Sequence, residues 1–335
     1  MVVRPWGSFV LLTRSGGAAA YDLGYTTYAI NRLCTSEHGL KSGLSRPKAP
    51  PEVIKQRMNQ HTHPNLSSII AQRDPARSAR LIGMVHAGAL PGTPFSAQSV
   101  EQLEQQAITE AKQIEDSGFD AIIVENMHDA PYVHGDQLGP EIVAAMSRLT
   151  LAVRNAVSIP VGIQILSGGN RHAIAVAYTN GLPFIRCENF VFAHIADEGL
   201  LPEAEAGGLL RYRKSIGAEH VKVFCDLKKK HASHAITSDV DLAQTAHAAE
   251  FFGADGFVVT GISTGKAAAL DDVKAVRNAT KLPVIVGSGV TPGYAESLSE
   301  YADALIVGSY IKHDGFWKNP VDPERLLAIV NAIGA

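Results

Sequence analysis

Short apolar runs alternate with longer amphipathic segments along the chain from residue 81 onward. Each run has the length of a β-strand, and the segments between runs carry apolar residues three and four positions apart, which is typical of helices packed on one face. The runs are almost continuously apolar, as expected of parallel strands covered on both faces. Eight runs fit this description: residues 81–85, 121–124, 161–165, 184–187, 221–225, 256–259, 284–286 and 304–307.

The segments between these runs predict helices, most clearly over residues 100–117, 140–156, 239–252 and 268–279. Eight strand–helix units in about 250 residues match a TIM barrel in count and in length. The sequence therefore predicts an α/β protein, a single TIM (β/α)8 barrel. An open doubly wound sheet is the alternative, and it is disfavoured because no GxGxxG motif follows the first strand.

The first 60 residues lack this pattern, and we interpret them as a flexible N-terminal extension before a barrel over residues 61–335. Arg4, Arg14 and Arg32 precede residue 36 together with one acid, Asp22. This bias is typical of organelle transit peptides. The alternative is that translation starts at Met58 and the preceding residues are a gene-model artefact. We expect an intracellular protein, mitochondrial if the extension is a transit peptide and cytoplasmic otherwise.

Composition and charge narrow the class of partner. The chain is 46% hydrophobic and 19% charged, as in globular proteins with a packed core, and its formal net charge is −3. This balance offers no electrostatic basis for binding nucleic acid, and no apolar run reaches the roughly 18 residues that span a bilayer. We expect a small-molecule partner, no nucleic acid, no membrane insertion and assembly into a homo-oligomer. Cys34, Cys187 and Cys225 form no short CxxC pair and are predicted to be free thiols.

Small residues follow the last predicted strands. In TIM barrels the loops after the seventh and eighth strands, with a helix N-terminus, commonly bind phosphate through backbone N–H groups. The sixth loop is expected to widen the same anion site. The alternative is that these glycines only form tight turns. The predicted phosphate-binding residues are Gly261, Thr264, Gly287, Ser288, Gly289, Gly308 and Ser309.

Ionisable side chains follow the second, fourth and fifth predicted strands. A lysine beside a carboxylate can perform acid/base or Schiff-base chemistry, although a run of three lysines is more often a solvated loop. Carboxylates from three strands can also converge on a divalent cation such as magnesium, or can pair with a cation such as Arg186. No histidine spacing predicts a zinc site. The predicted catalytic residues are Glu125, Glu188, Asp226, Lys230 and His231.

Residues 190–201 (FVFAHIADEGLL) form a longer connection than a minimal strand–helix joint. A lid or a contact between subunits would explain its length, and an ordinary packed loop is the alternative.

Several segments together resemble the BtpA family, a group of ribulose-phosphate-binding-type barrels. The resemblance runs from about residue 70 to the end of the chain. It implies a TIM barrel with a phosphate-type pocket, and it points to the same loops without implying a reaction. The loop 166–170 and the stretch 292–294 depart from the family pattern. The segments are Gly83-Met84-Val85-His86, Leu90-Pro91-Gly92, Glu125-Asn126-Met127-His128-Asp129-Ala130-Pro131, Phe184-Ile185-Arg186, Asp197-Glu198-Gly199, Lys230-His231-Ala232, Thr260-Gly261, Thr264-Gly265, Gly287-Ser288-Gly289-Val290 and Val307-Gly308-Ser309.

Two functions remain open at this point. The first is an enzyme, a lyase, isomerase or hydrolase, that acts on a small phosphorylated molecule of the phosphosugar or nucleoside type. The second is a non-catalytic assembly or biogenesis factor, a role implied by the photosystem I biogenesis from which the family takes its name. Clustered ionisable residues on the same rim as two phosphate loops favour the enzyme.

Overall fold

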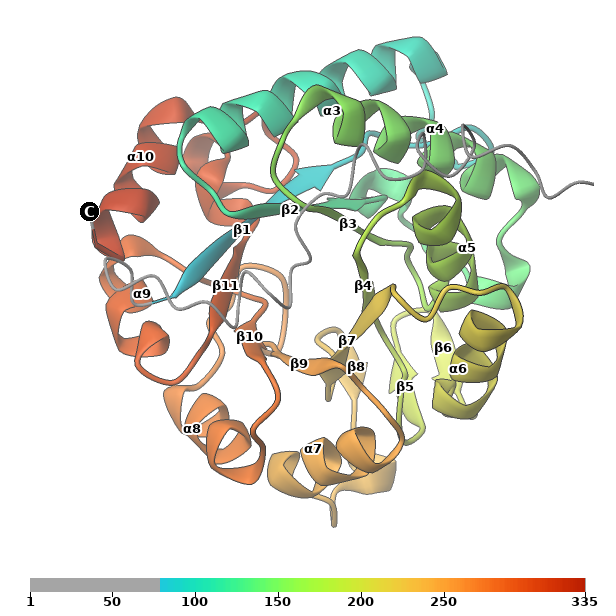
Figure 1. The fold of residues 1–335 in the computed structure, drawn as a ribbon, viewed down its shortest axis with the longest axis vertical. Helices are drawn as coiled ribbons and strands as arrows, with labels where there is room; N and C mark the ends of the chain where they lie inside the picture. Colours follow the sequence, from blue (N-terminus) through green and yellow to red (C-terminus); the bar gives the residue numbers. More distant parts are fainter. Residues whose placement is uncertain (1–78, 335) are drawn as a thin grey trace, which may run out of the picture. The chain divides into compact units, whose positions relative to one another are not determined.

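Eight parallel strands close into a barrel in the order β1-β11-β10-β9-β7-β4-β3-β2 (Figure 1). The computed structural model describes residues 79–334. Every barrel strand lies within one or two residues of a predicted run, so the prediction of a TIM barrel is confirmed. The barrel strands are β1 (Arg80–His86), β2 (Ala121–Glu125), β3 (Val161–Gln164), β4 (Phe184–Cys187), β7 (Lys222–Leu227), β9 (Gly256–Val259), β10 (Val284–Val286) and β11 (Ala304–Val307).

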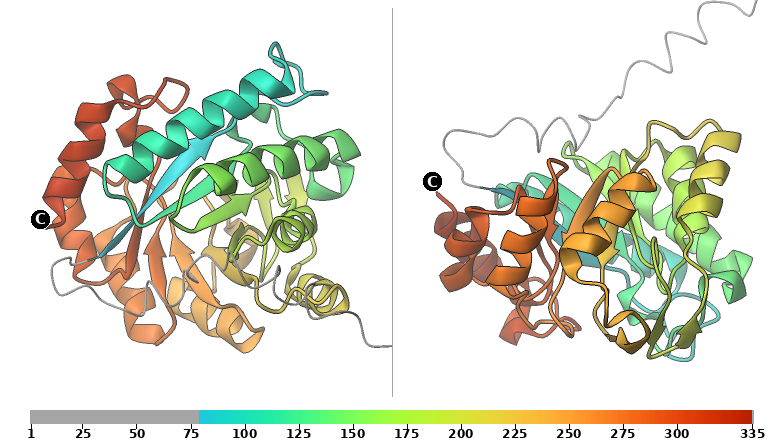
Figure 2. Two further views of the ribbon diagram at one scale, coloured as in Figure 1. Left: turned by 45° about the horizontal axis from the view of Figure 1, so that its top comes forward. Right: turned by 90° about the horizontal axis from the view of Figure 1, so that it is seen from below.

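Helices surround the barrel, as Figures 1 and 2 show. Ser99 and Asp241 begin α3 and α7 with capping boxes, in which each side chain accepts a backbone N–H that the helix itself leaves unpaired. Pro140, Pro292 and Pro323 occupy first-turn positions, where a missing N–H costs nothing. The helices are α3 (Val100–Asp116), α4 (Pro140–Ala156), α5 (Asn170–Asn180), α6 (Ala206–Ser215), α7 (Leu242–Phe251), α8 (Leu270–Ala279), α9 (Pro292–Ser299) and α10 (Pro323–Ala332).

Apolar side chains fill the barrel interior below its C-terminal mouth. Phe184 and Phe224 meet edge to face with ring centroids 5.8 Å apart. Gly162 makes room for them, because a Cβ there would lie 2.2 Å from the Phe184 ring. Met84 and Ile306 belong to the same interior cluster and also line the cavity above it. The interior is therefore a packed plug, and ligand chemistry is confined to the mouth.

A small antiparallel sheet extends the mouth beyond β4 and β7. It has the order β6-β5-β8 and consists of β5 (His194–Ala196), β6 (Gly199–Leu201) and β8 (Ala232–Ser233). The long connection over residues 190–201 is thus a β-hairpin tied to the segment after β7. Phe190 at its start is completely buried, which anchors the hairpin to the barrel.

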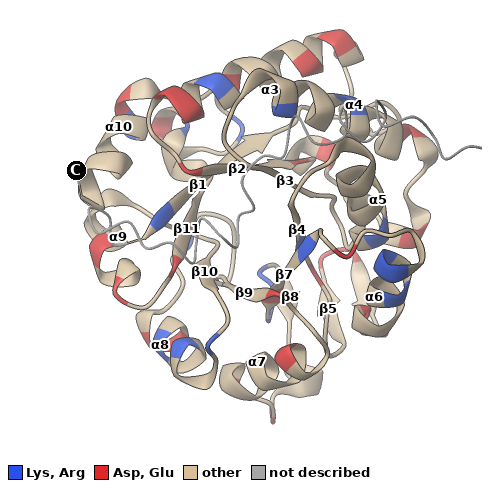
Figure 3. Cartoon of the chain, in the orientation of Figure 1, with Lys and Arg blue, Asp and Glu red and all other residues tan. Residues whose placement is uncertain are grey.

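Charged residues of both signs are distributed around the outer helices (Figure 3). No helix within residues 79–334 is long and apolar enough to cross a membrane. Cys187 and Cys225 are buried free thiols, as predicted, and Cys34 lies outside the described residues. The predicted extension over residues 1–60 and the boundary after it also lie outside them.

Candidate functional site

A cavity of about 160 Å³ opens at the C-terminal mouth of the barrel. It is bounded by residues from the ends of β1, β2, β4, β7, β10 and β11 and from the loop after β9. Six of the seven predicted phosphate-binding residues line it: Thr264, Gly287, Ser288, Gly289, Gly308 and Ser309.

Backbone amides without partners form one wall of this cavity. Within residues 79–334, the N–H groups of Ser288, Gly289 and Val290 donate no hydrogen bond. They immediately precede α9, whose N-terminus adds a partial positive charge. Such a row of amides before a helix is a ready-made site for an anion. The wall is therefore suited to a phosphate group.

Close packing explains why this wall is built from small residues. Gly289 has φ +64°, and a Cβ there would lie 2.2 Å from the backbone nitrogen of Ala267. The hydroxyl of Ser288 donates to the carbonyl oxygens of Ser263 and Lys266, at 3.2 and 2.8 Å. The Ser288 side chain thereby fastens the loop after β9 to the loop after β10. Gly261, the seventh predicted phosphate-binding residue, does not line the cavity. It gives the loop after β9 room to fold, since a Cβ there would lie 2.3 Å from the Lys266 carbonyl oxygen.

Lys230 and Glu125 face the cavity from the ends of β7 and β2. Among the described residues, the Lys230 ammonium group has no ion-pair or hydrogen-bond partner. Burial, together with the charge of Arg186, lowers the pKa of Lys230. Burial raises the pKa of Glu125. Both shifts favour the uncharged forms of the two groups.

His86 lies beside Glu125 and was not among the predicted catalytic residues. Its Nδ1 donates to the backbone oxygen of Trp317 at 3.3 Å, because a carbonyl can only accept. The Nε2 atom is then unprotonated in the neutral ring and lies 3.7 Å from Glu125 Oε2. Burial, reinforced by the charge of Lys312, lowers the pKa of His86 well below its usual value. A sequence signal existed, because His86 ends the first strand as Glu125 ends the second.

Asp226 is engaged in a buried ion pair with Arg186. The Nε and Nη2 atoms of Arg186 donate to the two carboxylate oxygens at 2.8 and 3.0 Å, and both side chains are almost completely buried. This bidentate pair holds the guanidinium under Gly287 at the base of the cavity. The structure thus gives Asp226 a positioning contact, and Arg186 lines the cavity in its place.

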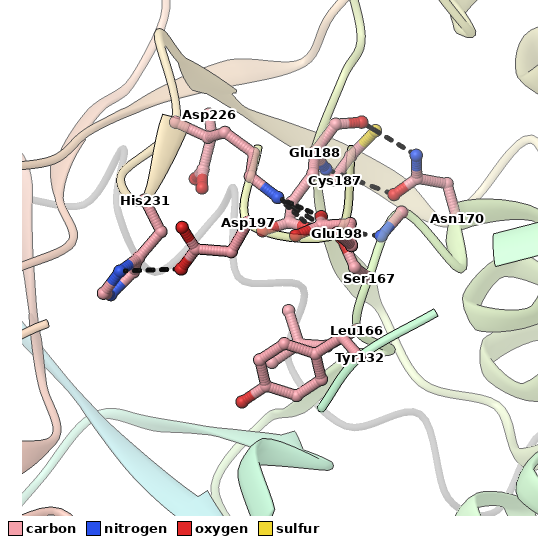
Figure 4. Close-up of polar contacts among 12 residues, drawn as sticks. Tyr132, Leu166, Ser167, Asn170, Cys187, Glu188, Asp197, Glu198, Asp226 and His231 are labelled. Carbon is pink, nitrogen blue, oxygen red and sulfur yellow. Dashed lines mark hydrogen bonds and ion pairs between the residues drawn. The ribbon is translucent and has the colours of Figure 1, made fainter. Parts of the chain in front are cut away.

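Glu188 belongs to a separate network on the opposite side of the mouth (Figure 4). One of its oxygens accepts from the Gly168 N–H at 3.0 Å and lies 3.5 Å from the Lys229 Nζ atom. Lys229 also donates to Glu198 at 2.8 Å, and Ser167 donates to the same Glu198 oxygen. Burial raises the pKa of Glu198, but the hydrogen bonds from Lys229 and Ser167 outweigh it, and the net pKa is lowered. The network joins the loops after β3, β4 and β7 to the β5–β6 hairpin.

The three consecutive lysines after β7 therefore have three different environments. Lys228 donates to the Val240 carbonyl oxygen, Lys229 is paired with carboxylates, and Lys230 faces the cavity. The expectation of a solvated loop is wrong for Lys229, whose side chain is only 6% exposed.

His231 supports the loop after β9 and does not line the cavity. Its Nε2 accepts the Thr264 N–H at 3.0 Å, which places the proton of the neutral ring on Nδ1. The Nδ1 atom lies 3.5 Å from an Asp197 carboxylate oxygen, an interaction that Figure 4 shows. Through this contact His231 fixes the position of Thr264, which does line the cavity.

The motif 125–131 combines two tasks. Glu125 and Met127 line the cavity. Asn126 exchanges two hydrogen bonds with the backbone of Leu166, at 2.7 and 3.2 Å. Asp129 accepts from Asn126 at 2.8 Å and from the Leu90 N–H at 2.8 Å. These two side chains therefore tie together the loops after β1, β2 and β3.

Metal ligands are not brought together in the described part of the chain. Within residues 79–334, no group of three or more His, Cys, Asp or Glu side chains is arranged to hold a metal ion. Of the three carboxylates that could converge on a cation, Asp226 pairs with Arg186 and Glu188 with Lys229.

The geometry defines a TIM-barrel protein with a cavity at the mouth of the barrel, and sequence comparison identifies the family. Residues 77–335 match the model of the BtpA family. The chain belongs to the BtpA family, so the predicted resemblance is confirmed.

Relatives occur in animals, archaea and cyanobacteria. An uncharacterised protein of Caenorhabditis elegans, whose name describes it as mitochondrial, is 44% identical over 73% of this chain and 90% of its own length. An uncharacterised protein of Methanocaldococcus jannaschii is 35% identical over 75% of this chain and 94% of its own length. The photosystem I biogenesis protein BtpA of Synechocystis is 33% identical over 76% of this chain and 87% of its own length.

Solved structures with the same fold are more distant. The (S)-3-O-geranylgeranylglyceryl phosphate synthase of Thermoplasma acidophilum, solved with sn-glycerol-1-phosphate, has a TM-score of 0.52 and 16% identity, covering 81% of this chain and 99% of that chain. The tryptophan synthase of Mycobacterium tuberculosis has a TM-score of 0.53 and 15% identity, covering 81% of this chain and 98% of that chain. These similarities establish the barrel fold.

Proposed function

We propose that this protein is an enzyme acting on a small phosphorylated molecule, of the phosphosugar or nucleoside type, at the mouth of its barrel. One observation carries the proposal. Three consecutive backbone amides and one lysine that have no partner among residues 79–334 line the same cavity. Buried polar groups are nearly always paired, so a cluster of unpaired donors in a cavity indicates the place of a ligand.

The amides of residues 288–290 would hold the phosphate, and Lys230 and Glu125 would face the remainder of the substrate. Lys230, with its lowered pKa, acts as the base or as the amine that attacks a carbonyl group. Glu125, with its raised pKa, supplies a proton to the developing oxyanion or leaving group. This acid/base pair suits a lyase, isomerase or hydrolase. Asp226 and His231 act through Arg186 and Thr264, as positioning residues.

We further propose that a divalent cation such as magnesium binds together with the phosphate. Glu125 is a carboxylate that lines the cavity, and phosphate oxygens would supply the further hard ligands that magnesium prefers. Glu188 and Asp226 have cationic partners of their own and are not part of this proposed site.

A thermal-shift screen of the full chain against phosphosugars, nucleoside monophosphates and divalent cations tests the proposal. A ligand at about 100 times its Kd stabilises the folded state by about 2.7 kcal/mol, which raises the Tm by several degrees. Gly289→Val should abolish the shift, because its side chain would collide with the backbone of Ala267. Gly293→Ala is the matched control, since a Cβ at Gly293 meets no atom within 4 Å. If no phosphorylated ligand raises the Tm of the wild type or of Gly293→Ala, the result counts against the proposal.

The alternative function is that of an assembly factor, which the name of the Synechocystis relative suggests. One observation favours it. Ile195 and Leu200 are opposite each other on the β5–β6 hairpin and are 44% and 53% exposed. Replacing both by serine should remove the cellular function of an assembly factor, whereas Lys230→Ala should leave it intact. The enzyme hypothesis predicts that Lys230→Ala removes the cellular function and that the double serine variant keeps it.

A mitochondrial location is a further part of the proposal. It is supported by the arginine-rich composition of residues 1–35 and by the name of the Caenorhabditis elegans relative. A fluorescent tag at the C-terminus of the full chain should reach mitochondria, and removing residues 1–57 should leave it in the cytosol. Mitochondrial import of the shortened chain would contradict a transit peptide in this segment.

A further inference from the structure

A second and larger cavity lies beside the phosphate cavity, and the proposed chemistry does not use it. Its volume is about 630 Å³, and it is formed by one face of α3, the loop after β1 and the segment 312–321 after β11. We call it the lateral groove. The side chains that matter for its chemistry are those of Gln98, Gln106, Gln113, His128 and Trp317.

The lateral groove adjoins the phosphate cavity. His86 lines both of them. Two loops also contribute residues to both spaces. In the loop after β2, Met127 lines the cavity and His128 lines the groove. In the segment after β11, Gly315 lines the cavity and Trp317 lines the groove. A single small molecule can therefore place its phosphate against the amides of residues 288–290 and extend past His86 into the groove.

The polar groups of the groove are mostly uncharged and unpaired. Among the described residues, the side-chain amides of the partly buried Gln98 and Gln113 make no hydrogen bond. His128 makes none either, and burial together with the charges of Lys312 and Lys318 lowers its pKa to about 4. His128 is therefore neutral at physiological pH. The groove offers hydrogen-bond donors and acceptors to a ligand group that carries no charge.

The buried cation next to the groove is already neutralised. Lys312 is 1% exposed and its Nζ atom lies 2.6 Å from the Glu110 carboxylate. A second phosphate of a ligand would have to compete with this carboxylate. Lys318 also lines the groove, and its Nζ atom lies 5.1 Å from the centroid of the Trp317 ring.

Trp317 adds an aromatic surface to these neutral groups. Its ring lies 4.9 Å from the His128 ring and 6.3 Å from the His86 ring, both edge to face. Its backbone oxygen accepts from His86, so the residue is held where the groove joins the cavity. Aromatic side chains stack on planar rings, and glutamine amides pair with the donor and acceptor edges of bases.

We propose that the lateral groove binds the nucleobase of a nucleotide whose phosphate occupies the barrel cavity. The substrate class of the proposed enzyme is then a nucleoside monophosphate or a related N-glycosyl phosphate, and the proposal rests on the proposed function for the phosphate end. The unpaired amides of the groove select the base, and Trp317 packs against its ring.

Trp317 fluorescence provides a direct test. Trp6 and Trp317 are the only tryptophans of the chain. In full-length Trp6→Phe protein, adenosine 5′-monophosphate should quench the fluorescence, and ribose 5-phosphate should bind without quenching it. Isothermal titration should show the nucleotide binding at least about fivefold tighter than the sugar phosphate, since stacking of one base contributes about 1–3 kcal/mol.

Substitution at Trp317 separates this inference from the proposed function. Trp317→Leu should reduce the preference for the nucleotide over ribose 5-phosphate by the contribution of stacking, about fivefold or more, and leave the affinity for the sugar phosphate unaffected. Phe251→Leu is the control, since Phe251 is 87% exposed on α7 and lines neither cavity.

Equal affinity for the two ligands, or a preference that Trp317→Leu does not reduce, would overturn the lateral groove and leave the phosphate site standing. Adenosine that quenches Trp317 while ribose 5-phosphate and inorganic phosphate fail to bind would support the groove and overturn the phosphate site. Failure of all four compounds to bind would overturn both.

Discussion

The two sides of the barrel mouth differ in whether their polar groups have hydrogen-bond or ion-pair partners. On the side of β10 and β11, the amides of residues 288–290 and the ammonium group of Lys230 line one cavity and have no partners in the described part of the chain. On the side of β3 and β4, Glu188, Glu198 and Lys229 are buried and bonded to one another (Figure 4). Both sides carry charged residues at strand ends, so residue type alone does not distinguish them.

We interpret the unpaired groups as ligand-binding groups and the paired groups as groups that stabilise the folded protein. A donor without a protein partner in a cavity has to be satisfied by water or by a ligand, whereas the groups of a complete network satisfy one another. The β5–β6 hairpin explains why the second side is complete, because it brings Glu198 to Lys229. We expect substitutions on the first side to change activity and those on the second to change stability.

The largest effect is expected for Lys230→Met. Removing the proposed base should lower the turnover of a phosphorylated substrate by about 10³- to 10⁴-fold. The Tm should stay the same or rise, because the side chain has no partner to lose and burial disfavours its charge. Steady-state kinetics and calorimetry on the same preparation measure both. A large fall in Tm with little change in rate would assign Lys230 to the structural side.

Lys229→Met is the matched substitution one position earlier. It leaves the buried carboxylates of Glu188 and Glu198 without their cation, and we expect the free energy of unfolding to fall by about 3 kcal/mol. Denaturant unfolding measures the loss. Adding Glu198→Gln to the variant should restore part of it, because one uncompensated charge is removed. If Lys229→Met unfolds with the same free energy as the wild type, the proposed stabilising role of the Lys229 side of the mouth is wrong.

Glu125→Gln should reduce the rate by about 100-fold at low pH, where the wild-type carboxyl group is protonated and able to donate. Burial raises the pKa of Glu125, so the wild type loses its acid as the pH rises through that value. Glutamine does not titrate, and the ratio of variant to wild-type rate should therefore increase with pH. Rates measured from pH 5 to pH 9 test this; a constant ratio would exclude Glu125 as the general acid.

The smallest effect concerns Glu205, an exception on the paired side. Burial, and more weakly the charge of Glu188, raises the pKa of Glu205 to about 7, although Asn170 donates to it. The folded state thus prefers the protonated form, and stability is lost as the pH rises from about 4.5 to about 7. Glu205→Gln should be more stable than the wild type at pH 8 by about 2 kcal/mol and equal to it below pH 4.5.

Denaturant midpoints at several pH values measure the effect, with the exposed Glu203→Gln as control. A pH dependence that persists in Glu205→Gln would assign the titration to another group.

The position of a residue at the end of a strand predicts some site residues and not others. The position after a strand correctly predicted that Glu125 and Lys230 face the mouth, because parallel strands of a barrel end on one rim. The same argument could not separate Lys229 from Lys230, since consecutive residues point in different directions and the Glu198 partner lies 31 positions away. His86 ends β1 as Glu125 ends β2, and its contact with Trp317 spans 231 positions.

The sequence by itself determined the barrel, its eight strands and the family, because apolar periodicity and glycine joints are local signals that parallel burial imposes on every repeat. It also indicated most of the residues that line the cavity near β10 and β11, since small residues after the last two strands are visible in the chain. Only the tertiary structure decided which polar groups are paired and which are left for a ligand. Pairing depends on partners brought together by folding, and the lateral groove is formed by α3 and the segment 312–321, about 200 positions apart.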